Sequence, residues 1–114
     1  MEMSACEPAS YSGIPVDTLF RIIEKVSGIK RFAVISRSRK RELSWIRFLI
    51  MYLLKSYTKL SLSEIGAVVL RNHATAVNGI RCMSNEFSAK SKVQITPNIN
   101  IIELYRIILN NLAI

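Results

Sequence analysis

Four consecutive residues, Asn72-His73-Ala74-Thr75, carry side chains suited to reading the edges of DNA bases. An Asn amide can pair bidentately with adenine, His and Thr can donate or accept hydrogen bonds, and an Ala methyl can pack on a thymine methyl. Such contacts require the segment to begin a helix that enters the major groove. The segment therefore predicts base reading. In the alternative interpretation, Asn72 only caps a helix and Thr75 only fills its first turn.

His73 is the single histidine of the chain, and we interpret it as a base or phosphate contact rather than a solvated side chain. A metal site would need further ligands at suitable spacing, and catalysis would need a nearby nucleophile or paired carboxylates. The sequence offers neither, and it has no G-x-x-x-x-G-K-[ST] segment. We therefore expect no cofactor, no metal, no nucleotide and no enzymatic activity. Cys6 and Cys82 are expected to be reduced thiols of a cytoplasmic protein.

Positive charge dominates the chain, with a formal net charge of +8. Residues 30–92 hold 13 Lys and Arg side chains against 3 Asp and Glu. The run at 37–41 suits the neutralisation of phosphates, although a solvated loop is the alternative. Arg47 interrupts an otherwise apolar helix, so its charge must reach solvent or a partner. A rigid arginine beside DNA can enter a narrow minor groove.

The elements that must position these residues are predicted to be helical. Residues 1–15 contain Pro and Gly and are expected to be flexible. Asp17 is expected to cap a first helix that runs to about Val26 and ends at Gly28. A short element is expected at 32–35.

A third helix over about 43–57 is apolar on most sides and should be central. Ser61 and Glu64 have the spacing of a capping box, which predicts a helix over 62–70. Asn72 is expected to cap the next helix after a tight turn. Its apolar face is expected to hold Val77, Ile80 and Met83.

Residues 84–97 are polar and predict a loop or a frayed helix end. An amphipathic helix is expected over about 98–112. It could cover the core, or it could form a homodimer or bind a protein partner; we favour core packing. No strand-like alternation is evident. The most apolar run, 45–54, is too short to cross a bilayer.

Several motifs recur in a characteristic order along residues 16–88. They are a basic loop, an Arg inside the following helix, Met-Tyr-Leu-Leu at 51–54, Ser-Leu-Ser-Glu-Ile-Gly at 61–66 and Arg-Asn-His-Ala-Thr at 71–75. This arrangement resembles the C-terminal DNA-binding domain of the bacterial chromosomal replication initiator DnaA.

The resemblance implies an all-α, compact multi-helix domain with a helix-turn-helix of the Trp-repressor-like, DnaA C-terminal type. A C-terminal amphipathic helix is added to it. The expected division is a flexible segment at 1–15, the DNA-binding domain at 16–89, a linker at 90–97 and a helical segment at 98–114.

The resemblance also implies contacts to a short AT-containing DNA box. Arg47 would be the minor-groove arginine. The major-groove positions would be Asn72, His73, Ala74 and Thr75. Contacts to phosphates are expected from Arg37, Arg39, Lys40, Arg41, Lys55, Ser61 and Arg71.

The chain departs from the family pattern at the proposed reading positions. Asn72 stands where the family has Asp, and Ala74 stands where it has Thr. A pair of glycines that commonly precedes the Arg is missing before Arg71, and the interval 65–71 is one residue short. A changed polar pairing alters discrimination by about 1–3 kcal/mol per position, so the preferred site is expected to differ.

We therefore predict a cytoplasmic, nucleoid-associated protein that binds double-stranded DNA with a sequence preference. It would regulate replication initiation or transcription without ATPase activity and without a membrane. The alternative is a protein-interaction module that keeps the fold and has lost specific DNA reading.

Overall fold

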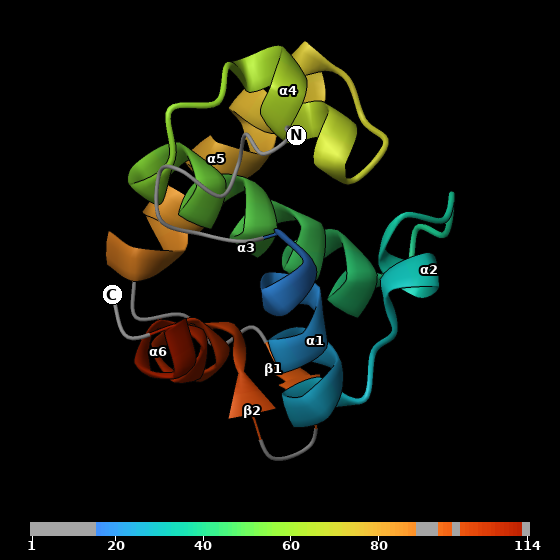
Figure 1. Cartoon of the computed structure of the whole chain (residues 1–114), viewed down its shortest axis with the longest axis vertical. Coiled ribbons are helices and arrows are strands. Elements are labelled where there is room, and N and C mark those ends of the chain that lie inside the picture. Colours follow the sequence, from blue (N-terminus) through green and yellow to red (C-terminus); the bar gives the residue numbers. More distant parts are fainter. Residues whose placement is uncertain (1–15, 89–93, 97–98, 113–114) are drawn as a thin grey trace, which may run out of the picture.

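The computed structural model of the chain describes residues 16–88, 94–96 and 99–112, and within them the fold is all-α apart from one short hairpin (Figure 1). The predicted flexible segment 1–15 lies outside the described residues. The elements are α1 (Val16–Ser27), α2 (Arg31–Val34), α3 (Arg41–Tyr57), α4 (Leu62–Val68), α5 (His73–Ser88), β1 (Gln94–Thr96), β2 (Ile99–Asn100) and α6 (Ile101–Leu112).

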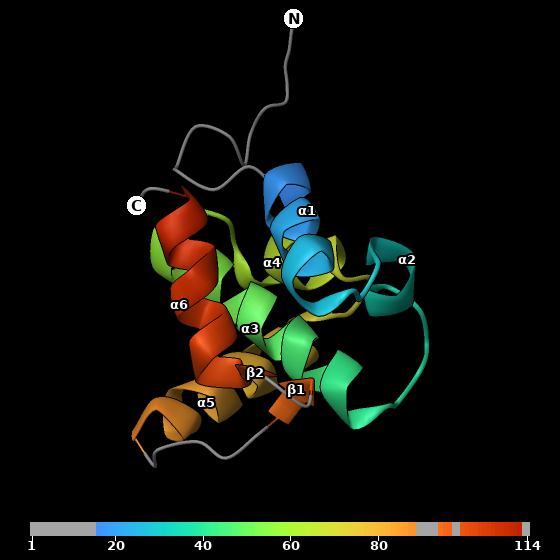
Figure 2. The ribbon, with the colours of Figure 1, turned by 90° about the horizontal axis from the view of Figure 1, so that it is seen from below.

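Helix α3 is the centre of the fold, as its nearly continuous apolar surface predicts. It contacts α2, α4, α5 and α6, while α1 packs against α6 (Figures 1 and 2). α5 crosses α3 closely at Gly79, where an added Cβ would lie 2.5 Å from Met51 Cε. The buried apolar residues of α3 are Leu43, Ile46, Leu49, Ile50, Met51, Leu53 and Leu54.

Helix α1 ends as predicted and begins differently. Gly28 has φ +78°, and its N–H donates to the Glu24 carbonyl at 2.8 Å. The prediction that Asp17 is a cap is wrong, because Asp17 lies inside the first turn of the helix. Its carboxylate instead accepts a hydrogen bond from Arg31 Nη1 at 2.6 Å. The Arg31 guanidinium also lies 4.5 Å from the centre of the Phe20 ring, which ties α2 to α1.

The hairpin was not expected from the sequence. β1 and β2 pair antiparallel with Gln94 opposite Asn100, and the strands span 3 and 2 residues. Strands of this length are too short to show an alternating pattern. Asn100 then begins α6 with a reciprocal cap: its Oδ1 accepts the Glu103 N–H at 2.8 Å, and Glu103 Oε1 accepts the Asn100 N–H at 3.1 Å.

The apolar stripe of α6 packs within this chain. Helix α6 contacts α1 and α3, and it lies at the lower left in Figure 1. Ile101, Leu104 and Ile108 have no exposed surface. The expected core packing of this helix is therefore confirmed.

Helix α4 ends at Val68, two residues earlier than predicted, in a Schellman motif. The Arg71 N–H donates to the Gly66 carbonyl at 2.7 Å, and the Leu70 N–H donates to the Ala67 carbonyl at 3.0 Å. Leu70 takes the left-handed position of this motif with φ +56°, although Gly is the usual residue there. Gly66 permits the close return of the chain, since a Cβ would lie 2.7 Å from the Arg71 oxygen.

Replacing Leu70 by Gly should raise the free energy of unfolding by roughly 0.5–1 kcal/mol, because Gly adopts a positive φ without the clash of a Cβ. Little packing is lost, since 65% of the Leu70 surface is exposed. Urea unfolding followed by circular dichroism measures the change. Leu70→Ala keeps the Cβ and is the matched control. A Gly variant no more stable than the Ala variant would contradict strain at this position.

Candidate nucleic-acid interface

Helices α4 and α5 form the predicted helix-turn-helix, and both are capped as expected. Ser61 Oγ accepts the Glu64 N–H at 3.2 Å, and Glu64 Oε1 accepts the Ser61 N–H at 2.8 Å. Hydrogen bonding of the Glu64 carboxylate to the Ser61 N–H, and to a lesser extent to the Ser61 side chain, lowers the pKa of Glu64. Asn72 Oδ1 accepts the Thr75 N–H at 2.9 Å, so Asn72 is the N-cap of α5. The turn between the helices lies between the Schellman motif at the end of α4 and the Asn72 cap at the start of α5.

The first turn of α5 is open to solvent. Asn72, His73 and Ala74 are exposed, and Thr75 is half-buried at the edge of a groove. The cap uses one lone pair of Asn72 Oδ1, which leaves its amide N–H groups and a second lone pair available. All four predicted reading residues therefore lie together at one accessible helix start.

The inner face of α5 differs from the predicted one. Ala76, Gly79 and Met83 are buried and Ile80 is half-buried, whereas 41% of the Val77 surface is exposed. The prediction that Val77 joins the apolar core face is wrong. Because α5 presses on α3 at Gly79, the core face is centred on the small residues, and Val77 is turned outward. Three exposed residues of the outer face were missed by the sequence analysis: Val77, Asn78 and Arg81.

A groove with a volume of about 690 Å³ separates the start of α5 from the basic loop at 37–41. Of the described residues, its lining includes four arginines and no Asp or Glu. Concentrated positive charge in a groove attracts a polyanion. The lining residues are Arg37, Ser38, Arg39, Ser44, Arg47, Phe48, Leu70, Arg71, Asn72, Ala74, Thr75 and Asn78.

Two arginines hold the basic loop against the helix-turn-helix. Arg47 Nε donates to the Val34 carbonyl at 2.6 Å, and its Nη2 donates to the Ser36 carbonyl at 3.0 Å. Arg71 Nη2 donates to the same Ser36 oxygen at 2.7 Å. Burial, with a smaller contribution from the charge of Arg71, lowers the pKa of Arg47. The position of the loop therefore depends on both side chains.

Arg47 lines the groove but is largely buried, with only 5% of its surface exposed. Its guanidinium donates to the two loop carbonyls at the groove, and its role as the minor-groove arginine stays a prediction. Arg71 is half-buried and also bonds to the Val69 and Leu70 carbonyls, each at 3.2 Å. Both arginines are thus engaged within the chain in this conformation.

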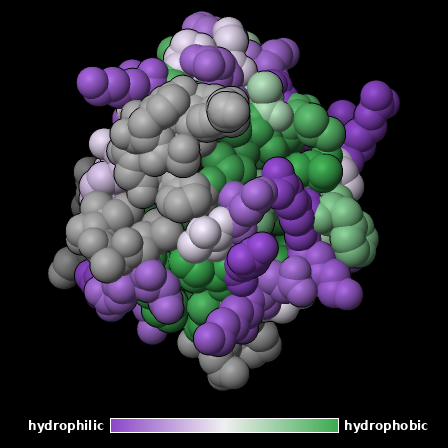
Figure 3. Space-filling model, viewed as in Figure 1, coloured by the Kyte–Doolittle hydropathy of each residue, from purple (hydrophilic) through white to green (hydrophobic). Residues whose placement is uncertain are grey.

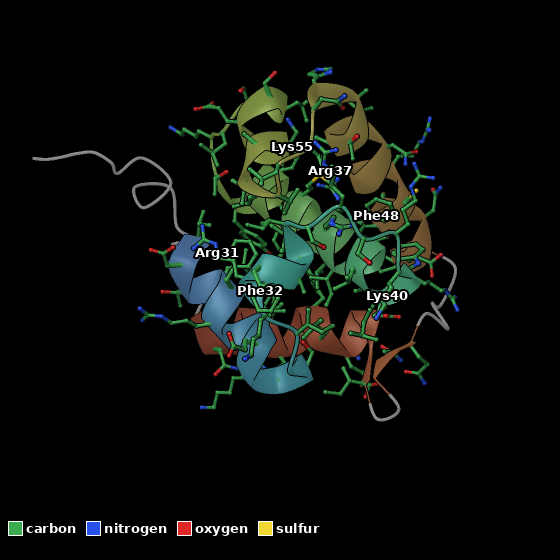
Figure 4. All side chains as sticks on the ribbon, turned by 90° about the vertical axis from the view of Figure 1, so that its right-hand side faces the viewer. Arg31, Phe32, Arg37, Lys40, Phe48 and Lys55 are labelled. Carbon is green, nitrogen blue, oxygen red and sulfur yellow. The ribbon has the colours of Figure 1, made fainter. Side chains whose placement is uncertain are left out.

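The other predicted phosphate contacts are more accessible. Arg37, Arg39, Lys40 and Arg41 are exposed in or next to the loop, and Lys55 is exposed in the last turn of α3. Ser61 is exposed too, although its hydroxyl caps α4. Arg37 lies next to the α4–α5 unit in Figure 4, and hydrophilic side chains project over α4 in Figure 3. Of these cations, Arg37 and Arg39 line the groove beside the start of α5, whereas Lys40 lies with Lys30 and Glu42 at a second hollow.

The described ranges hold no group of three or more His, Cys, Asp or Glu side chains placed to bind a metal ion. None of the helices described is both long enough and apolar enough to cross a membrane.

The Arg47→Lys variant keeps the positive charge but should lose the two hydrogen bonds that the guanidinium donates to the Val34 and Ser36 carbonyls. We expect a loss of about 1–2 kcal/mol in the free energy of unfolding, since buried carbonyls lose their partners. Trypsin should also cut the 37–41 segment several-fold faster. The control is Arg39→Lys at an exposed position. If both variants behave alike in urea unfolding and in proteolysis, Arg47 does not hold the loop.

The helix-turn-helix region of this chain is similar to that of known proteins. A model of the family described as "Bacterial dnaA protein helix-turn-helix" matches residues 16–82, from the start of α1 into α5. The match spans the basic loop, both arginines at Ser36 and the first turn of α5.

Curated relatives share this region. The chain is 34% identical over 74 residues to the chromosomal replication initiator protein DnaA of Porphyromonas gingivalis, covering 64% of this chain and 16% of that protein. It is 32% identical over 92 residues to the protein of that name from Oleidesulfovibrio alaskensis, covering 79% and 20%. The chain thus spans a fifth or less of the length of these relatives. No solved structure matches it.

Proposed function

This chain belongs to the bacterial DnaA helix-turn-helix family, and from that premise we propose that it binds double-stranded DNA with a sequence preference. The observation that carries the proposal is the exposed, capped start of α5 beside a groove lined by four arginines. Helix α5 would enter the major groove, and α4 would cross the sugar–phosphate backbone.

Each part of the interface then has a distinct role. His73, Ala74 and the remaining polar atoms of Asn72 would face base edges, with Thr75 beside them. Exposed loop cations, together with Lys55, would neutralise phosphates of a strand that lies along the groove. We assign Arg47 and Arg71 to positioning the loop, since both donate to the Ser36 carbonyl. Ser61 would approach a phosphate through the amide end of α4.

The process is proposed from the relatives. They are named chromosomal replication initiator proteins, so we propose that this chain occupies DNA sites that control replication initiation or transcription. Residues 1–114 contain no G-x-x-x-x-G-K-[ST] segment. We therefore propose that site occupancy by this chain does not involve ATP hydrolysis.

The competing role as a protein-interaction module rested partly on the apolar helix near the C-terminus. That helix is α6, and Ile101, Leu104 and Ile108 are buried against this same chain. Its apolar stripe is therefore already covered, which favours DNA as the partner. An interaction module that has lost specific reading would show no preference between a selected and a scrambled duplex.

His73→Ala should weaken binding to a duplex selected from a random pool by about 5- to 150-fold, because a base contact contributes about 1–3 kcal/mol of discrimination. Binding to a scrambled duplex should change little. Fluorescence anisotropy with labelled duplexes measures both affinities. Equal losses on the two duplexes would argue against base reading by the start of α5.

Lys40→Ala should weaken binding to both duplexes similarly and reduce the slope of log affinity against log salt by about 1, as expected for one lost phosphate contact. The matched control is Lys25→Ala, an exposed cation on α1. An unchanged salt slope in Lys40→Ala would show that this lysine does not contact a phosphate.

A further inference from the structure

Val77 is an apolar side chain exposed on the outer face of the helix that we propose reads DNA. It is one of three large hydrophobic residues that the described part of the chain exposes, with 41% of its surface accessible. The other two are Phe32 on α2 and Leu70 in the turn. Only Val77 of the three lies on α5.

The helical period places Val77 on the same side of α5 as the proposed reading residues. It follows His73 by four positions and Ala74 by three, so its side chain lies one turn further along that face. The buried side of α5 is marked by Ala76, Gly79 and Met83. Val77 is therefore directed outward with His73 and Ala74.

The polar neighbours of Val77 are engaged with one another. Arg81 Nη2 donates to Asn78 Oδ1 at 3.3 Å, and Cys82 Sγ lies 3.9 Å from the same oxygen. This leaves the two methyl groups of Val77 as an apolar surface in the second turn of α5. In the major groove, the apolar group that a base presents is the C5 methyl of thymine. Guanine presents polar acceptors instead, which Val77 would desolvate without a partner.

We propose that Val77 is a specificity-determining residue that packs on the C5 methyl of one thymine in the bound site. The inference rests on the proposed DNA binding and extends the reading face by one helical turn. It assigns Val77 a preference that neither Asn72 nor His73 would supply.

Replacing single thymines by deoxyuridine in the selected duplex tests this proposal, because the change removes only the methyl group. Wild-type protein should bind one such duplex about three- to fivefold more weakly, the value expected for one buried methyl group. Val77→Ala should bind the thymine and deoxyuridine forms of that position equally. Ala is favoured in helices, so α5 should persist, and circular dichroism verifies it.

Phe32→Ala is the control, since it removes an exposed apolar side chain from α2 and should leave the deoxyuridine effect unchanged. The inference is overturned if the wild type shows no deoxyuridine effect, or if Val77→Ala retains the same effect at the same thymine. Proposed DNA binding survives both results. Absence of any preference between selected and scrambled duplexes in the wild type would refute that proposal, and with it this inference.

Discussion

The carbonyl oxygen of Ser36 accepts hydrogen bonds from two guanidinium groups that belong to different parts of the fold. One is Arg47 on α3 and the other is Arg71, which directly precedes the cap of α5. This shared acceptor fixes the distance between the basic loop and the helix-turn-helix. Two like charges close together repel, and burial of Arg47 adds a desolvation penalty. Carbonyl acceptors at 2.6–3.0 Å offset both effects. Arg37 and Arg39 of the loop stay exposed beside the groove.

Local signals in the sequence were enough to predict the helix-turn-helix and the central helix. The capping box at Ser61 and the cap at Asn72 depend on residues three apart, and the apolar surface of α3 is continuous along the chain. Arg47 could not be placed in this way. Its partners are backbone carbonyls 11 and 13 residues away, which no side-chain pattern records. Val77 was assigned to the core because apolar spacing alone does not reveal that α5 meets α3 at Gly79.

The far end of α5 is held by aromatic packing rather than by caps. Tyr52 of α3, Phe87 of α5 and Tyr105 of α6 form one cluster, with ring centres 4.7–6.0 Å apart. Burial raises the pKa of Tyr105. Tyr52 and Tyr105 thus anchor the C-terminal end of α5 through Phe87, while the first turn of α5 stays accessible. Sequence patterns indicated α6, yet they did not indicate that it would pack against the end of α5.

The turn before α5 reaches a left-handed backbone conformation with Leu70 where glycine is usual. Two hydrogen bonds to Gly66 and Ala67 stabilise this shape, so the turn geometry does not require a glycine at its own apex. A related chain could therefore lack the glycine pair before the residue that corresponds to Arg71 and still hold the following helix at a similar angle. A search motif that demands those glycines would overlook such descendants.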